Sequence, residues 1–396
     1  MPPNDSAEDL SNRARRFGLV IYQDRLIYDA QPGITDELIS KVEGHCRGEL
    51  PDELKLLWRA SFGGSVDYDL EIELGDAIVE FSFTELFYPG SDGYRDLTGW
   101  IEYELELAEE VAHEHGQNFD GRLGYLPFGG FEYADRLYIC VEPGPDYGSV
   151  HAWMHGLPPA WVLRLNDDRA GRIADNLPSL FRRLDLASDP FAATEDKFAM
   201  GGNLAAIVEK IDGEDRDLSE RLRELVRDAV VDWPSALANG SLAVKPRHCR
   251  LAMRDAIERD DRGQLLRLES LGCSFQQRLR ADGNALDFAL ALGRIDTAEF
   301  LFDRGVRSLQ AIRNGARTAP AGFVRRLLES GAQPSALAAK AAALAGFHES
   351  AVLIASALEP DERARFAAEL DPDKAQEKWK AIEMLRDACF AMDRKP

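Results

Sequence analysis

Residues 253–272, MRDAIERDDRGQLLRLESLG, and residues 286–305, LDFALALGRIDTAEFLFDRG, decide the architecture of the second half of this chain. The two stretches stand 33 residues apart and match at apolar or small positions and at a closing glycine. The matched pairs are Met253 and Leu286, Ala256 and Ala289, Leu265 and Ala298, Leu268 and Leu301, and Gly272 and Gly305. Such a repeat predicts helix pairs that must stack, because one pair cannot bury its apolar face alone.

Two further copies of the pattern follow. A third, compressed to a spacing of 26 residues, contains Ile312, Val324, Leu327 and Gly331, and a weaker fourth contains Ala339, Ala342, Ala351 and Ile354. Small residues on the first helix of each pair permit close packing, and leucines on the second helix fill the space between pairs. The closing glycines are expected to end the second helices with a positive φ. Residues 360–396 are predicted to form charged capping helices.

The clearest copy resembles an ankyrin repeat. Residues 282–289 (DGNALDFA), followed by Gly293, Leu301 and Gly305, are similar to the family pattern Gly-x-Thr-Pro-Leu-His-x-Ala with its later Gly and Leu-Leu-x-x-Gly. The stretch lacks one residue before Leu286, lacks Thr-Pro, and has Asp287 in place of His. The resemblance covers roughly 250–358 and implies an all-α array that binds partners on its concave face.

The first half has the pattern of a mixed α and β domain. In residues 67–74 (DYDLEIEL), apolar and acidic residues alternate, which predicts a strand with one apolar and one carboxylate face. Residues 78–83 are predicted to form its antiparallel neighbour. Short helices are expected over 35–43 and from Pro51 to Gly63, and further strands over 25–28, 136–141 and 149–153. Residues 176–184 are expected to close the domain as an amphipathic helix.

Residues 100–115 allow two interpretations. Ile101, Tyr103 and Leu105 alternate with glutamates as in a strand, whereas the Glu, Leu and Ala content and the spacing of Trp100, Leu107 and Val111 favour a helix. We favour the helix. Trp58, Trp100, Trp153 and Trp161 are expected in the core.

Four segments of this half resemble the SUKH (Smi/Knr-like) superfamily, and they occur in the order found in that family. They are 50–64, with Leu-Pro-Asp-Glu-Leu and a Gly-Gly stop; 126–138, with Leu-Pro-Phe and Ala-Asp-Arg-Leu-Tyr; 148–155; and 173–184. The sequence departs from the family at Phe62, where Asn often precedes the glycine pair, and at Ala134, where Gly is common. The resemblance implies an α+β fold with an antiparallel sheet and flanking helices. It commonly implies an immunity protein that neutralises a polymorphic bacterial toxin, and other members are regulatory interaction domains.

Charge is distributed unevenly along the chain. Residues 1–190 contain 36 Asp and Glu against 16 Lys and Arg, a net charge of −20, and residues 191–396 contain 33 against 31, a net charge of −2. Residues 66–120 contain 16 acidic residues and one basic residue, Arg95. Such a field repels nucleic acid and attracts a basic partner. The predicted partner-binding carboxylates are Asp67, Asp69, Glu71, Glu73, Glu102, Glu104, Glu106 and Asp135, although Asp135 also suits a turn that caps local amides.

Other classes of function find little support in the sequence. No nucleophile has a recognisable elbow or paired base, no phosphate-binding or dinucleotide motif occurs, and His113 and His115 would not converge on one helix. We therefore expect no catalytic residues, cofactor or metal. The five scattered cysteines suggest buried thiols in a reducing compartment. The absence of an apolar span or signal core favours a cytoplasmic protein without membrane contact.

These patterns predict four regions: a SUKH-like domain over 1–190, a helical linker region over 191–245, ankyrin-like repeats over 246–359 and capping helices over 360–396. The expected function is stoichiometric inhibition, in which the acidic 66–110 surface binds a basic protein partner such as a toxin domain. The alternative is a regulatory adaptor or scaffold that binds partners through the ankyrin-like array.

Overall fold

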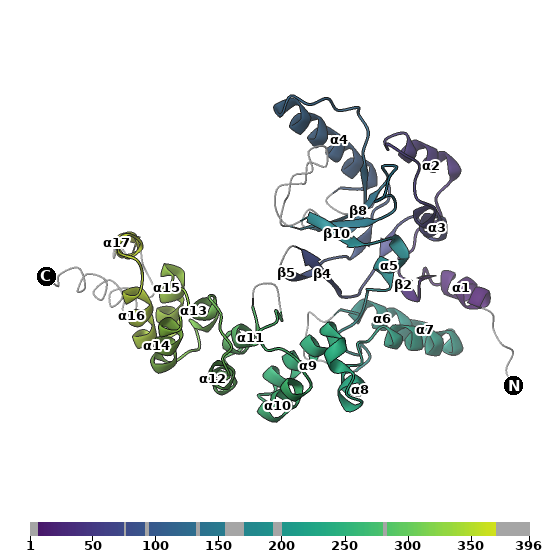
Figure 1. Ribbon diagram of the computed structural model, residues 1–396. Coiled ribbons are helices and arrows are strands. Elements are labelled where there is room, and N and C mark those ends of the chain that lie inside the picture. Colours follow the sequence, from purple (N-terminus) through teal and green to yellow (C-terminus); the bar gives the residue numbers. More distant parts are fainter. Residues whose placement is uncertain are drawn as a thin grey trace. The chain divides into compact units, whose positions relative to one another are not determined.

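The chain forms two compact units, Met1–Val231 and Asp232–Pro396. A computed structural model describes residues 7–74, 77–91, 95–131, 135–154, 170–192, 200–279 and 283–369 (Figure 1). The first unit combines helices with antiparallel sheets, and the described part of the second is all-helical. This confirms the predicted change from a mixed first half to a helical second half. Within these ranges, no helix has the length and apolar character needed to cross a membrane.

The main sheet of the first unit is antiparallel throughout, with strand order β10-β9-β8-β7-β6-β3 in the described residues. Its strands are β3 (Gly64–Ser65), β6 (Glu85–Leu86), β7 (Tyr125–Phe131), β8 (Asp135–Cys140), β9 (Val150–Met154) and β10 (Ala170–Ala174). Two hairpins accompany it: β1 (Val20–Tyr22) with β2 (Arg25–Ile27), and β4 (Leu70–Leu74) with β5 (Ala77–Phe81). The four segments that resemble the SUKH superfamily include all or part of β3, β7, β8, β9 and β10.

Both faces of β8 are buried, and they differ in chemistry. Leu137 and Ile139 pair with Ala152 and Val150 of β9, and all four belong to the main apolar core. On the opposite face, Arg136 pairs with Trp153, and Tyr138 pairs with His151. Because successive side chains of a strand point to opposite faces, one strand supplies both the core and a buried polar layer.

The predicted β4–β5 hairpin is confirmed. Leu70, Ile72 and Leu74 are buried, whereas Glu71 is half-buried and Glu73 is exposed. The register places Ile72 opposite Val79 and Glu71 opposite Glu80, so one face carries apolar residues and the other carries carboxylates.

The helices of the first unit are α1 (Ala7–Arg15), α2 (Asp36–Glu43), α3 (Asp52–Ala60), α4 (Leu97–Glu114), α5 (Leu177–Phe181), α6 (Gly202–Asp212) and α7 (Arg216–Asp228). The sequence correctly predicted α2 and α3. Thr35 caps α2 by accepting a hydrogen bond from the Leu38 amide, and Pro51 stands at the N-cap of α3. Trp58, Trp100 and Trp153 are buried as predicted, and Trp161 lies outside the described residues.

Residues 97–114 form a helix, which decides between the two interpretations of this stretch. Asp96 caps it by accepting a hydrogen bond from the Gly99 amide at 2.8 Å. Its buried residues are Leu97, Trp100, Ile101, Glu104, Ala108 and Ala112, a helical stripe with one carboxylate inside it. That carboxylate interrupts the apolar pattern and produced the apparent strand alternation.

Helices α6 and α7 belong to the first unit, which differs from the predicted linker over 191–245. Leu204, Val208, Leu222 and Val226 are buried in the same core as the main sheet. Arg13 of α1 also donates a hydrogen bond to Asp215 at 2.6 Å, next to the start of α7. These residues pack with segments more than 100 positions away, so local sequence could not place the boundary.

The second unit contains α8 (Trp233–Ala238), the 3-10 helix η1 (Leu242–Val244) and a series of helix pairs. The pairs are α9 (Pro246–Glu258) with α10 (Arg262–Ser270), α11 (Ala285–Ala291) with α12 (Ile295–Asp303), α13 (Ala311–Gly315) with α14 (Ala321–Glu329), and α15 (Ala336–Leu344) with α16 (His348–Ser356). Helix α17 (Pro360–Glu369) follows, and residues 370–396 of the predicted capping helices lie outside the described residues. First helices pack against first helices, α9 on α11, α11 on α13 and α13 on α15. The predicted stack of helix pairs is therefore present.

The closing glycines adopt the predicted backbone conformation. Gly272, Gly305 and Gly331 have φ values of 89°, 84° and 94°. The residue after each glycine donates its amide back into the helix, Cys273 to Leu268, Val306 to Leu301 and Ala332 to Leu327, at 3.0–3.1 Å. This is the Schellman arrangement, and it repeats at the same place in three pairs.

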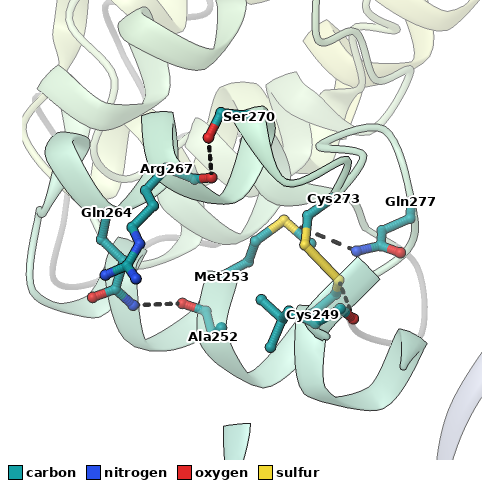
Figure 2. Close-up of a disulfide and its surroundings, with 9 residues drawn as sticks. Cys249, Ala252, Met253, Gln264, Arg267, Ser270, Cys273 and Gln277 are labelled. Atoms are coloured by element: carbon teal, nitrogen blue, oxygen red, sulfur yellow. Dashed lines mark hydrogen bonds between the residues drawn. A yellow bond between two sulfur atoms is a disulfide. The ribbon is translucent and has the colours of Figure 1, made fainter. Parts of the chain in front are cut away.

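The cysteines partly contradict the prediction of free thiols. Cys249 of α9 and Cys273, which follows α10, form a disulfide (Figure 2). Cys46 and Cys140 are buried and free, and Cys389 lies outside the described residues. The sequence could not predict the pairing because 24 residues separate the two partners, which approach only when the helices pack.

Candidate partner-binding site

The outer face of α4 carries a row of exposed carboxylates. Glu102, Glu106, Glu110 and Glu114 follow one another at four-residue spacing, and Glu109 is exposed beside them. Residues four apart lie one above the other on a helix. The helix contains no Lys or Arg, and none of these five glutamates forms an ion pair within the described ranges. We call these five residues the acidic row.

The acidic row opposes the stability of its own helix. Like charges at i and i+4 destabilise a helix by about 0.2–0.5 kcal/mol per pair. The negative end of the helix dipole is at the C-terminus, where Glu114 lies, and the first turn contains no acidic residue. The buried stripe that contains Trp100 and Ile101 therefore holds the helix in place against its surface charge.

The exposed members of the predicted site lie on two separate elements. Glu102 and Glu106 belong to the acidic row on α4, which packs against β7, whereas Glu73 lies on β4, which packs against β10. Strands β7 and β10 are three positions apart in the sheet, or about 14 Å at the usual strand spacing. The exposed predicted carboxylates are therefore held on elements that contact different strands of the sheet.

Two predicted carboxylates lie at the base of the β4–β5 hairpin. Asp69 is half-buried, and its Oδ2 accepts a hydrogen bond from the Ala187 amide at 2.8 Å. Glu71 is half-buried as well, and its carbonyl oxygen accepts a hydrogen bond from Arg183 at 3.0 Å. Asp69 thus fastens the segment that follows α5.

Three predicted partner-binding residues are buried, which corrects their assignment. Asp67 accepts a hydrogen bond from the Asn203 amide at 2.7 Å, and Asp135 accepts one from the Ser82 amide at 3.0 Å. Glu104 points beneath α4 and is 2% exposed. A partner cannot contact these carboxylates from solvent, and each stabilises the first unit instead.

Glu109, Glu110 and Glu114 were not among the predicted site residues. The signal that identifies them is their spacing from Glu102 and Glu106, which has meaning only once the segment is known to be a helix. Exposure then separates them from Glu104, which has the same side chain and lies two residues from Glu102 and from Glu106.

A buried polar cluster fastens α4 to the sheet. The Arg136 guanidinium lies 4.3 Å from the Trp100 ring centre and 4.2 Å from that of Trp153. Arg136 Nε donates a hydrogen bond to Tyr138 Oη at 2.7 Å, and Tyr138 donates one to Glu104 Oε1 at 2.7 Å. Arg136 and Tyr138 belong to β8 and Glu104 to α4, so the cluster links the helix that carries the acidic row to the strand beneath it.

Burial shifts the titration of this cluster. Burial raises the pKa of Glu104, and Arg136 and Tyr138 oppose that rise. Burial and the neighbouring Glu104 raise the pKa of Tyr138 well above 10.0. Burial alone would lower the pKa of Arg136, but Tyr138 and Glu104 outweigh it, and the pKa is raised. Tyr138 therefore stays a neutral donor to Glu104 at physiological pH.

A serine and a histidine lie together on the same face of the sheet but do not form an activated pair. Ser149 Oγ is 3.0 Å from His151 Nε2. The Ser149 hydroxyl donates its proton to the Asp146 carbonyl oxygen, so His151 must donate to Ser149 and cannot accept its proton. Burial lowers the pKa of His151 to about 4, and both side chains are shielded from solvent. We assign this pair a structural role.

Comparison with protein-family models finds no match, and comparison with curated proteins finds no matching relative. Among the described residues, no group of three or more His, Cys, Asp or Glu side chains is placed to hold a metal ion.

Proposed function

We propose that this chain is a cytoplasmic binding protein, not an enzyme, that neutralises a basic toxin domain by stoichiometric binding. The observation that carries the proposal is the acidic row on α4. It consists of exposed, unpaired glutamates on a helix whose stability they reduce. In our proposal a partner supplies the positive charge that this surface lacks in the free protein.

The charge of the first unit supports a basic partner. Residues 1–231 contain 46 Asp and Glu against 22 Lys and Arg, a net charge of −24, whereas residues 232–396 contain 23 against 25, a net charge of +2. Such a field accelerates encounter with a cationic protein at low salt. It disfavours nucleic acid as the direct ligand.

The resemblance to the SUKH superfamily supports the toxin class of partner. Its four segments include β7, β8 and β9, which are neighbouring strands of one sheet. The helix that packs on this sheet carries the acidic row. In our proposal the row occupies the basic substrate site of the toxin, and buried anchors elsewhere in the interface supply most of the affinity.

The test is charge reversal on α4 with a matched control. In the first variant, Glu102, Glu106, Glu110 and Glu114 are changed to Lys. In the control, the exposed residues Glu209, Glu214, Glu224 and Asp228 are changed to Lys, which alters the net charge equally in the same unit. Where the gene for this chain has a polymorphic toxin gene beside it, affinity for the basic domain of that toxin is measured at 50 and 300 mM salt.

We expect the α4 variant to bind at least about 100-fold more weakly and to lose most of its salt dependence, while the control changes little. Circular dichroism should show an unchanged total helix content, because lysine is more favourable than glutamate near the C-terminus of a helix. Equal losses in both variants would show that only total charge matters and would contradict docking through α4.

The alternative function, an adaptor that binds through the helical array, is favoured by a specific observation in the second unit. Leu309 and Leu337 are 59% and 73% exposed. Leu309 precedes α13 and Leu337 lies in the first turn of α15, and the segments before these two helices are joined because the Gln333 amide donates to the Leu309 carbonyl at 2.9 Å. If this surface binds the partner, changing Leu309 and Leu337 to Glu abolishes binding and the α4 variant retains it.

A further inference from the structure

The Cys249–Cys273 disulfide joins the two helices of the first pair in the second unit. Cys249 lies within α9, Cys273 follows Gly272 at the end of α10, and their Cα atoms are 6.0 Å apart. Both cysteines are buried, at 3% and 4% exposure. Figure 2 shows the disulfide between Cys249 of α9 and Cys273 in the turn after α10, with Met253 beside it.

At the position of Cys273 the fold of the repeat needs a buried side chain but does not need a disulfide. The equivalent residues after the closing glycines of the next two pairs are Val306 and Ala332, each buried at 4% exposure. The pairs that contain them fold around an ordinary apolar side chain. A cysteine with a second cysteine in reach is therefore a chemical feature of the first pair, which the packing of the repeat does not explain.

The structure also accommodates the reduced state. Cys249 Sγ lies 3.3 Å from the carbonyl oxygen of Leu242, to which a thiol can donate a weak hydrogen bond. The backbone of Cys273 stays fixed by its amide, which donates to Leu268 at 3.0 Å. With the crosslink broken, the Cys249 thiol would therefore keep an acceptor and the Cys273 backbone its hydrogen bond to α10.

We propose that Cys249 and Cys273 form a redox-operated clasp that controls the opening of the α9–α10 pair. One cysteine thiolate attacks glutathione disulfide and expels a glutathione thiolate, and the second thiolate then attacks the mixed disulfide and expels another. Two electrons pass from the protein sulfurs to glutathione disulfide, and the two thiol protons end on two glutathione molecules. Reduced glutathione reverses the reaction.

The clasp acts where the stack of helices begins. Helix α9 packs against α8, η1, α10 and α11, so opening of the first pair exposes the end of the array. In a reducing cytoplasm the open form is accessible, and oxidative conditions close it. Oxidation thereby makes the first pair rigid without changing its fold.

The test uses the full chain in defined mixtures of reduced and oxidised glutathione. Peptide mapping after alkylation measures the Cys249–Cys273 crosslink, and amide hydrogen exchange measures the opening of residues 246–273. We expect reversible crosslinking and exchange in this segment roughly 10- to 100-fold slower in the oxidised form. Residues of the first unit should be unaffected.

Two variants separate the clasp from simple packing. Cys273→Val copies the residue at Val306, so it should fold with the exchange rates of the reduced protein and ignore glutathione. Cys46→Ser, at a buried free thiol in the first unit, should keep the full response. Failure of glutathione disulfide to form the crosslink, or a crosslink that leaves exchange unchanged, would overturn the proposal.

Discussion

Arg136 and Glu104 are charged side chains inside the first unit, where an unpaired ion costs several kcal/mol to bury. Their side chains are 3% and 2% exposed, and Arg136 Nε lies 3.5 Å from Glu104 Oε1. The guanidinium also contacts the rings of Trp100, Trp153 and Tyr103 and the Tyr138 hydroxyl. The pair fixes the position of α4 on the sheet, because a shift of the helix would separate the two charges.

Removal of Arg136 tests this pairing. We expect Arg136→Ala to destabilise the first unit by about 3–5 kcal/mol, because Glu104 is left buried and uncompensated. Replacement of both residues, Arg136→Met with Glu104→Leu, should cost less than the single change. Arg172→Ala, at a salt bridge with a 42% exposed side chain, serves as the surface control and should cost less than about 1 kcal/mol. Urea unfolding followed by tryptophan fluorescence measures all three, and equal losses for Arg136→Ala and Arg172→Ala would refute the account.

His151 predicts a dependence of stability on pH. Burial lowers its folded-state pKa to about 4 from 6.5, so between these values the unfolded chain binds more protons. Its contribution is fully present above pH 6.5 and is lost as the pH falls toward 4. The loss is up to about 3 kcal/mol.

His151→Gln retains a side-chain amide donor for Ser149 and cannot titrate. The stability difference between wild type and this variant, measured by urea unfolding from pH 7.5 to 4.5, should shrink as the pH falls. Parallel curves for the two proteins would exclude His151 as the source.

At the scale of the element, the closing glycines show how backbone conformation ends the second helix of each pair. Gly305 has a φ of 84° and open space where a Cβ would stand, so only backbone strain opposes a side chain there. Gly322, inside α14, also has open space, but its φ lies outside the left-handed range. A side chain meets no neighbour at either position, so substitutions at Gly305 and Gly322 differ only in backbone strain.

We expect Gly305→Ala to destabilise the second unit by about 1–2 kcal/mol, because alanine is forced into the left-handed region. Gly322→Ala should stabilise it by up to about 1 kcal/mol, since alanine favours the helix. Thermal unfolding of the two variants gives opposite shifts of the midpoint. A shift of the same sign in both variants would mean that backbone φ does not determine the change in stability.

At the scale of the whole molecule, the boundary between units determines which fragments fold. Leu204, Val208, Leu222 and Val226 are buried in the first core, and the Val231 amide donates to the Leu186 carbonyl at 2.9 Å. Each fully buried leucine or valine contributes about 1.5–3 kcal/mol relative to exposure. Helices α6 and α7 are therefore part of the fold.

A fragment of residues 1–231 should unfold cooperatively in urea, whereas a fragment of residues 1–190 should expose its core and bind a hydrophobic dye. Dye fluorescence and near-ultraviolet circular dichroism distinguish the two states. If the shorter fragment is as stable as the longer, α6 and α7 are a dispensable addition.

Helix pairs, closing glycines and the β4–β5 hairpin could be predicted from the sequence because short-range rules decide them. The spacing of Leu265, Leu268 and Gly272 reports a helix and its end, and the alternation around Ile72 reports a strand. Such patterns act over one or two turns or a few residues of strand. They need no knowledge of distant segments.

The candidate site was only partly predictable. The sequence located the acidic segment. Within it, however, Glu102 is exposed, whereas Glu104 is buried between α4 and the sheet. The difference arises because Arg136 and Tyr138 of β8 meet the inner face of α4. No local pattern in residues 97–114 contains those partners.

By itself, the sequence determined the structural class of each half, the repeating helix pairs and which half of the chain carries the negative charge. Only the tertiary structure decided which carboxylates face solvent, which cysteines join and where the first unit ends. The physical reason is one of range: backbone preference and periodicity are local, whereas burial, ion pairing and disulfide formation depend on segments far apart in the chain.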